Sequence, residues 1–196
     1  AGRFMELDKG RLVAYIQETQ MCRAPQISRM RVYHLGEFMR VDGPTRQALD
    51  LFGRGRGLIT AIDSTCTPMG GRLIRQWLDR PSVSAAEINA RLDSVGELAA
   101  DTFMRADVRA ALDRMYDLER TCGRIGYRSA GPRDLLALAA SLEAAACLEQ
   151  ALAAASPLLV ELRSAVDPVP EAVGRIRESI RDDAKAAVGE GGIIRA

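Results

Sequence analysis

The single histidine is the first residue to test for catalysis, because imidazole is the commonest acid–base group near neutral pH. The chain has one, His34. A Ser-His-Asp or Cys-His relay needs it beside a nucleophile. The sequence indicates no such neighbour, and we expect a structural or surface role for His34.

A second candidate is a group of carboxylates interleaved with arginines. The group comprises Asp113, Asp117, Glu119, Arg114, Arg120 and Arg124. Paired carboxylates can carry acid–base chemistry when one of them is buried. On a helix with opposite charges three and four residues away, they usually form exposed ion pairs of small energy. We expect ion pairs here.

The run Gly53-Arg54-Gly55-Arg56-Gly57 has two interpretations. A flexible basic loop would touch phosphate with salt-sensitive, sequence-independent affinity. A glycine turn would join two ordered segments and leave its arginines in water. Two arginines are too few for an autonomous binding motif, so the turn is favoured. Arg54 and Arg56 are kept as candidates for weak phosphate contacts.

Metal and nucleotide signatures are missing from the sequence. No C-x-x-C pair or histidine cluster offers zinc four close ligands, and free thiols in a cytosolic protein are expected. Neither G-x-x-x-x-G-K-[ST] nor a dinucleotide-binding glycine run occurs. We therefore assign no catalytic, cofactor or metal residue to this stretch. The four cysteines are Cys22, Cys66, Cys122 and Cys147.

Composition narrows the class of protein. The 27 basic and 26 acidic residues give a net charge of +1, which argues against a domain that coats nucleic acid. The longest uncharged stretch, 150–160, falls short of the roughly 18 to 20 apolar residues of a membrane span. No secretory pattern opens the chain. We expect a soluble cytoplasmic protein with no membrane partner.

Apolar residues recur at spacings of three and four, which predicts an all-α fold. A first helix is predicted over residues 4–19, followed by an extended connector over 22–33. Residues 32–51 are ambiguous, with either a short strand pair or a helix from Thr45. Thr67 and Pro68 are suited to the N-cap and first position of the next helix, which Pro81 ends. Its apolar face carries Met69, Leu73 and Trp77.

Gly70 and Gly71 are costly inside that helix. Close approach of another backbone is the expected reason, and a phosphate site at the helix N-terminus is a weaker alternative.

Further helices are marked by caps and stripes. Ser84 and Glu87 form a capping box. Gly131-Pro132 opens a long helix, Ser156-Pro157 a short one, and residues 169–180 close the series. The result is a multi-helix bundle with at most a short strand pair. The predicted buried stripes are Ile88, Leu92, Val95 and Ala99; Met104, Val108, Ala111, Leu112 and Met115; and Leu135, Leu138, Leu142, Ala145 and Leu152.

Several stretches together resemble one family. Residues 57–78 read GLITAIDSTCTPMGGRLIRQWL, and 87–95 (EINARLDSV), 117–120 (DLER), 132–138 (PRDLLAL) and 191–195 (GGIIR) follow in order. Upstream, 12–20 (LVAYIQETQ), 38–42 (FMRVD) and Thr45-Arg46 fit the same order. This series is similar to the core, or lever, region of the MutS family of mismatch-recognition proteins.

The resemblance implies that residues 1–20 are the helix linking a connector domain to the core. Residues 21–196 would be the core, truncated before the clamp. It also implies a mechanical role, in which the core links mismatched-DNA binding on the clamp side to an ATPase domain. Neither active site maps onto these residues, so this stretch would not be an enzyme by itself.

The full-length protein implied by the resemblance is a DNA-dependent ATPase that uses ATP and Mg. Its partners would be duplex DNA with mispairs, a second copy in a homodimer, and repair factors of the MutL type, in the nucleoid-associated cytoplasm. Two alternatives stay open. One is a helical interaction module of a MutS paralogue outside mismatch repair. The other is a free-standing helical enzyme using His34 or the carboxylate group.

The resemblance also implies that the chain leaves for the clamp at Gly191-Gly192 and later returns to cover the core. Without the returning helix, residues 135–152 and 169–180 should keep uncovered apolar positions. We then expect non-native dimerisation through that surface, unless the bundle closes on itself. Residues 189–196 should be mobile unless a neighbour orders them.

Overall fold

The structure, a computed structural model, describes residues 18, 36, 38–53, 55, 57–153, 155–184 and 193–195. This part of the chain confirms the all-α prediction, since it contains helices and only two isolated bridges, Phe38 with Ser82 and Ile180 with Ile194. The helix predicted over 4–19 lies outside the described residues except for the helical Glu18, and so does the connector predicted over 22–33.

Residues 38–83, which we call the arm, contain α2 (Gly43–Ala48), α3 (Leu58–Ile62) and α4 (Pro68–Asp79). The carboxylate of Asp42 accepts the Thr45 N–H at 2.8 Å and caps α2. Within the described part of the ambiguous segment, residues 43–48 are helical and the helix begins two residues before Thr45, while Phe38 makes an isolated bridge with Ser82.

The predicted start of α4 is confirmed. Thr67 is its N-cap, and the Thr67 hydroxyl accepts the Gly70 N–H at 3.0 Å. Pro68 occupies the first turn, where a missing N–H has no cost. The helix ends at Asp79, two residues before Pro81. Local chemistry alone thus determines both ends of this helix.

Residues 84–184, which we call the bundle, contain the remaining helices. The predicted starts at Gly131-Pro132 and Ser156-Pro157 are both confirmed. The helices are α5 (Ala85–Ala100), α6 (Thr102–Asp113), α7 (Leu118–Gly126), α8 (Pro132–Ala151), α9 (Pro157–Ser164) and α10 (Pro170–Ser179).

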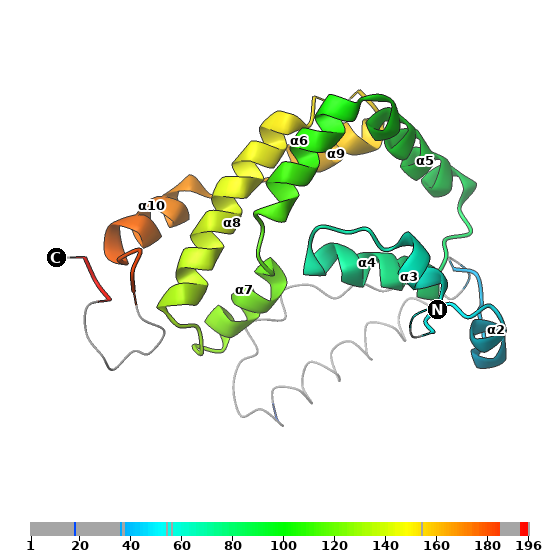
Figure 1. Ribbon diagram of the computed structural model, residues 1–196, viewed down its shortest axis with the longest axis horizontal. Coiled ribbons are helices and arrows are strands. Elements are labelled where there is room, and N and C mark those ends of the chain that lie inside the picture. Colours follow the sequence, from blue (N-terminus) through cyan, green and yellow to red (C-terminus); the bar gives the residue numbers. More distant parts are fainter. Residues whose placement is uncertain are drawn as a thin grey trace.

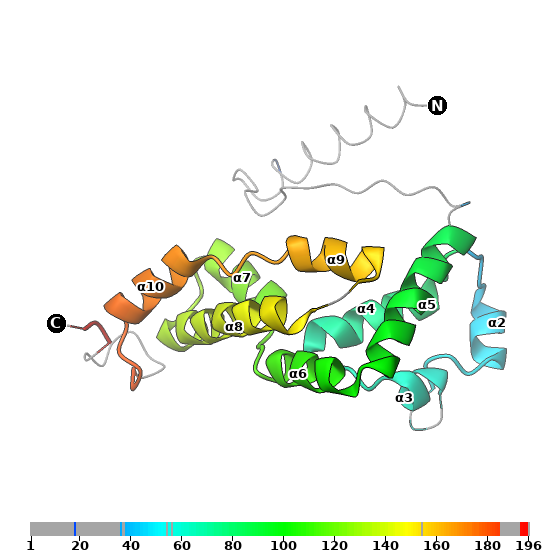
Figure 2. The ribbon, with the colours of Figure 1, turned by 90° about the horizontal axis from the view of Figure 1, so that it is seen from above.

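Helix α8 is the centre of the bundle. It packs against α6, α7 and α10, while α5 packs against α6 and α9. Figure 1 shows α6 running alongside α8, with α10 and α7 near the end of α8 where that helix begins, and Figure 2 shows α9 at its other end. The two N-terminal helices of the arm, α2 and α3, lie well away from α8 in both views.

Small residues, rather than leucines, form most of the buried face of α8. Ala139, Ser141, Ala144 and Ala145 are buried. The predicted stripe is correct for Ala145 and Leu152, whereas its other three leucines, Leu135, Leu138 and Leu142, are half-buried. A helix with neighbours on several sides needs short side chains where the backbones approach each other. Its leucines then pack at the edges of these contacts, where they stay half-buried.

The predicted buried stripe of α5 is wrong. Ile88, Leu92 and Val95 are 40%, 60% and 62% exposed. The buried residue of α5 is Ser94, whose hydroxyl donates to the Ala90 carbonyl at 2.8 Å. Helix α5 therefore packs through its Ser94 side, and its apolar stripe, about a third of a turn away, faces outward.

The capping box at the start of α5 is only half formed. The Ser84 hydroxyl accepts the Glu87 N–H at 3.4 Å. The Glu87 carboxylate does not return the bond, because it accepts from the Ser82 hydroxyl at 2.6 Å and pairs with Arg91.

Uncovered apolar side chains gather on α4 and α5 instead of the predicted segments 135–152 and 169–180. Leu73 and Trp77 of α4 are 45% and 42% exposed. Over 169–180, Val169 is exposed, but Val173 and Ile176 are half-buried and Ile180 is buried. The expected uncovered surface on α8 and α10 is thus wrong, because those two helices cover each other.

Residues 193–195 pair with the end of α10. The Arg181 N–H donates to the Ile193 carbonyl at 2.9 Å, and the Arg195 N–H donates to the Ser179 carbonyl at 3.0 Å. These hydrogen bonds tie residues 193–195 to the end of α10, and the mobility expected over 189–196 stays a prediction. Residues 185–192 and 196 lie outside the described part.

Candidate functional site

The residues proposed for phosphate contact are not described by the structure. Arg54, Arg56 and His34 all lie outside the described residues, so their roles stay predictions. The glycines around the two arginines do form a turn between α2 and α3. Gly55 has φ +86°, and a Cβ on Gly57 would lie 2.4 Å from the Gly53 nitrogen. This backbone therefore needs glycine at both positions.

The carboxylates that precede and open α7 meet an arginine far away in sequence. Both terminal nitrogens of Arg72 donate to the two oxygens of Asp117 at 2.8 Å. The Arg72 Nε also donates to Glu119 at 2.9 Å. Ion pairs were predicted here, but with neighbours on the same helix. The main partner instead belongs to α4, because the arm brings Arg72 against the start of α7.

This environment excludes Asp117 from acid–base catalysis near neutral pH. Hydrogen bonds from Arg72 hold the pKa of Asp117 down to about 2, against the opposing effect of burial. The same two carboxylates raise the pKa of Arg72. Asp117 and Arg72 therefore both stay charged near neutral pH, so this pair holds two elements together and has no proton to transfer.

The remaining carboxylate of the predicted group, Asp113, faces a cysteine. Burial raises the pKa of the Cys66 thiol, and a hydrogen bond with Asp113 raises it further. A thiol held protonated in this way is a poor nucleophile and a poor metal ligand. The described residues contain no group of three or more His, Cys, Asp or Glu side chains that could hold a metal.

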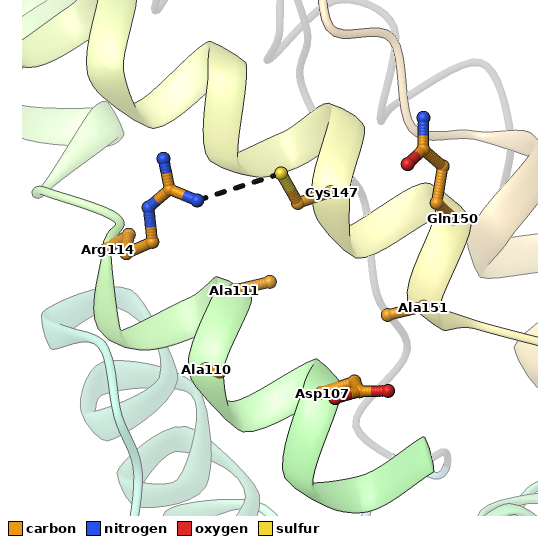
Figure 3. Close-up of a pocket in the computed structure, with 7 residues that line it drawn as sticks. All are labelled: Asp107, Ala110, Ala111, Arg114, Cys147, Gln150 and Ala151. Carbon is orange, nitrogen blue, oxygen red and sulfur yellow. Dashed lines mark hydrogen bonds between the residues drawn. The ribbon is translucent and has the colours of Figure 1, made fainter. Parts of the chain in front are cut away.

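A groove of about 380 Å³ runs between α6 and α8 (Figure 3). Alanines form its floor, while Arg114 and Cys147 point toward each other at one end with Nη1 and Sγ 3.8 Å apart. Asp107 lies at the other end. The groove reflects the close approach of two alanine-rich faces, and its separated polar groups form no nucleophile–base pair.

The reason for glycine at positions 70 and 71 of α4 differs from the predicted one. A Cβ on Gly70 would lie 3.1 Å from the Thr67 hydroxyl and 3.3 Å from the Thr65 Cβ. One on Gly71 would lie 3.4 Å from the Thr65 hydroxyl. The approaching atoms are side chains from the preceding segment rather than another backbone.

The alternative phosphate site at this N-terminus is disfavoured. The Asp63 carboxylate accepts from the Thr65 N–H and hydroxyl beside it. A negative charge in this place repels an anion.

Sequence reasoning missed two contacts that fix the bundle. Glu97 of α5 accepts the backbone N–H groups of Ala155 and Ser156, at 2.5 and 2.8 Å, at the start of α9. Arg177 of α10 makes a two-pronged pair with Glu143 of α8, both bonds being 2.9 Å. No local spacing predicts either contact, since the partners are separated by 34 residues or more.

No helix of the described residues is long and apolar enough to cross a membrane. The described residues thus form a packed helical centre and an ion-paired junction between α4 and α7. Within this part of the chain, the side chains described above form no nucleophile–base pair.

Comparison with known proteins agrees with this architecture and with the motifs. A family profile described as MutS domain III matches residues 44–196. The chain is 38% identical over 191 residues to the DNA mismatch repair protein MutS of Brevibacillus brevis, covering 94% of this chain and 22% of that protein. It is 39% identical over 195 residues to the protein of the same name from Synechococcus elongatus, covering 95% and 22%. The chain spans about a fifth of the length of these relatives. With its motifs in family order and the domain profile matched over most of its length, the chain belongs to the MutS family and carries that family's domain III.

Proposed function

We propose that this chain is the mechanical core of a longer mismatch-recognition ATPase. In that role it passes movement between the part that grips DNA and the part that hydrolyses ATP, and it contains neither site. The observation that carries the proposal is the central position of α8, which contacts α6, α7 and α10 within a domain assigned to the MutS core.

The dimensions of α8 suit such a role. Its 20 residues correspond to a rod of about 30 Å. The Arg177–Glu143 pair holds α10 to this rod, and the Arg124–Asp134 pair, at 2.6 Å, holds α7 to its first turn. A displacement at one end therefore moves several neighbours together. Packed helices with discrete arrangements are the elements through which coupling between sites travels.

The remaining properties are proposed for the whole protein. The relatives are named DNA mismatch repair proteins. We infer that the longer protein binds duplex DNA with mispairs as a homodimer, uses ATP and Mg, and passes the signal to MutL-type factors in the cytoplasm beside the nucleoid. Within this chain, Arg54 and Arg56 are proposed to make weak phosphate contacts. The proposed division is residues 1–20 as a connecting helix and 21–196 as core.

Lowering the helical stability of α8 in the full-length protein tests the proposal. Cys147 and Gln150 are exposed on α8, and replacing both with glycine costs about 1 kcal/mol of helix stability per site. We expect mismatch binding and basal ATP hydrolysis to persist, while stimulation of hydrolysis by mismatched DNA falls severalfold.

The matched control places the same glycine pair at Asp93 and Ala99, exposed positions of α5. It should lower the melting temperature similarly and keep the stimulation. Equal stimulation in the α8 variant and the wild type would contradict the transmission role.

The chain by itself should neither hydrolyse ATP nor discriminate mismatched from matched duplex. Its net charge of +1 allows only weak binding that declines steeply with salt. Phosphate release above background, or a preference for the mismatch at physiological salt, would show that a site lies within this segment.

A further inference from the structure

The arm and the bundle are joined in an unusual way for a helical domain. The extensive helix–helix packing of the described residues joins bundle helices to one another. Helix α4 has no buried residue, although α8 has five. The apolar side chains Leu73 and Trp77 remain more than 40% exposed. Hydrophobic packing therefore contributes little to holding α4 in place.

Polar contacts supply the connection instead. Away from the linker at 80–84, several polar contacts join the arm to the bundle among the described residues. Arg72 pairs with Asp117 and Glu119. Arg109 of α6 donates to the Ser64 carbonyl at 3.3 Å. The Cys66 thiol faces Asp113, and the Arg91 guanidinium lies 3.9 Å from the centre of the Trp77 ring.

The charges of the two parts are complementary. The arm carries seven arginines and four aspartates. The bundle carries twelve arginines and seventeen acidic residues. A positive arm is thus attracted to a negative bundle, and salt weakens attraction between exposed charges.

We propose that Arg72, Asp117 and Glu119 form an electrostatic latch that sets the position of the arm relative to the bundle. When the latch opens, α4 pivots about the linker at 80–84, where Pro81 follows the end of the helix. This inference goes beyond the proposed function, because it concerns contacts within the chain and holds whether or not the chain transmits a signal.

The latch also reaches the central helix. Asp117 is the N-cap of α7, and its carboxylate accepts the Arg120 N–H at 3.2 Å while it holds Arg72. Helix α7 in turn is tied to the first turn of α8 through the Arg124–Asp134 pair. One carboxylate therefore both orients the arm and caps a bundle helix, so the position of the arm bears directly on the start of α7.

Amide hydrogen exchange on the whole chain, read by mass spectrometry, tests the latch. In Arg72→Gln, amides of residues 63–79 should exchange about fivefold faster than in the wild type, while those of α8 stay unchanged. Raising the salt from low to molar concentration should accelerate the same amides in the wild type and have little effect in the variant.

Two further variants separate the latch from general damage. Asp117→Asn removes the charge but keeps an equally good N-cap, so the exchange of α7 should stay near that of the wild type while α4 exchanges faster. Arg124→Gln breaks an ion pair of similar exposure inside the bundle and should leave residues 63–79 unchanged.

Three results would overturn the proposal. One is α4 exchange that is insensitive to both Arg72→Gln and salt. Another is faster exchange spread equally over α4 and α8, which would indicate global destabilisation. The third is an Arg124→Gln effect on α4 as large as that of Arg72→Gln.

Discussion

The arm and the bundle have similar helix caps, but different forces hold their helices in place. Close packing holds the central helix of the bundle, whereas charged side chains hold α4 of the arm. In the bundle, α8 buries alanines and a serine against its neighbours. In the arm, α4 buries none of its residues and leaves Leu73 and Trp77 exposed. The bundle is thus a packed body whose geometry resists change, since close-packed cores respond to even a methylene group. The position of α4 depends mainly on charged side chains.

The comparison teaches that a periodic apolar stripe does not identify the face that packs. Helix α5 has a clear stripe and packs through Ser94 instead. Helix α8 has abundant leucines, yet its residues without exposed surface are Ala139, Ser141 and Ala144. Close approach between helices selects small side chains, so the best packed face is not the most hydrophobic one.

The largest expected effect is a loss of stability when a larger side chain is placed in the packed centre of the bundle. Ala139 of α8 is fully buried, and Ala139→Leu should destabilise the chain by about 2–3 kcal/mol, because added methylenes have no space. The same change at exposed Ala61 of α3 should cost less than about 0.5 kcal/mol. Urea denaturation measures both. Similar losses at the two positions would remove the contrast between bundle and arm.

A smaller effect is expected from the buried serine of α8. The Ser141 hydroxyl accepts the Tyr116 N–H at 3.0 Å and donates to the Ala137 carbonyl at 2.8 Å. Ser141→Ala leaves that N–H without its partner and should cost about 1–2 kcal/mol. Ser164→Ala removes an exposed hydroxyl as the control. A neutral Ser141→Ala in urea denaturation would mean that this polar contact does not stabilise the bundle.

Acid should weaken the latch before it disturbs the centre of the bundle. The folded pKa of Asp117, about 2, lies below the ordinary value of 3.8. The pair therefore contributes fully above pH 4, and the contribution is lost as the pH falls toward 2. Exchange of α4 amides should accelerate across this range in the wild type.

In Asp117→Asn, exchange should already be fast at pH 5 and change less with further acidification, after correction for intrinsic exchange. Asp93→Asn, which removes an exposed carboxylate of α5, should follow the wild-type profile. If the exchange of α4 amides depended on pH identically in Asp117→Asn and the wild type, the acid effect could not be assigned to Asp117.

The smallest expected effect is a gain in stability from a substitution in the linker before α10. Val169 has φ 44° and ψ 62°, a left-handed conformation that a β-branched residue adopts only under strain. Val169→Gly should relieve that strain and stabilise the chain by about 0.5 kcal/mol after the entropy cost of glycine. Val173→Gly, inside α10, should destabilise it instead. A loss of stability in Val169→Gly, measured by calorimetry, would show that the valine side chain matters more than the strain.

Local sequence chemistry was sufficient to locate several helix starts. The pairs Thr67-Pro68, Gly131-Pro132 and Ser156-Pro157 each mark a helix start that the structure confirms. Caps act over three or four residues, so they operate in the chain before any tertiary contact forms. The ordered motifs likewise identified the family from sequence alone.

Tertiary structure decided which faces pack and which charges meet. Arg72 lies in the motif over 57–78, and Asp117 and Glu119 lie in the motif over 117–120, yet no spacing rule pairs groups about 45 residues apart. The burial of Ser94 and Ala139, rather than nearby leucines, depends on neighbouring helices that local periodicity does not identify. A helix carries its caps in its own sequence, but its buried face and its ion-pair partners are set by the helices that approach it.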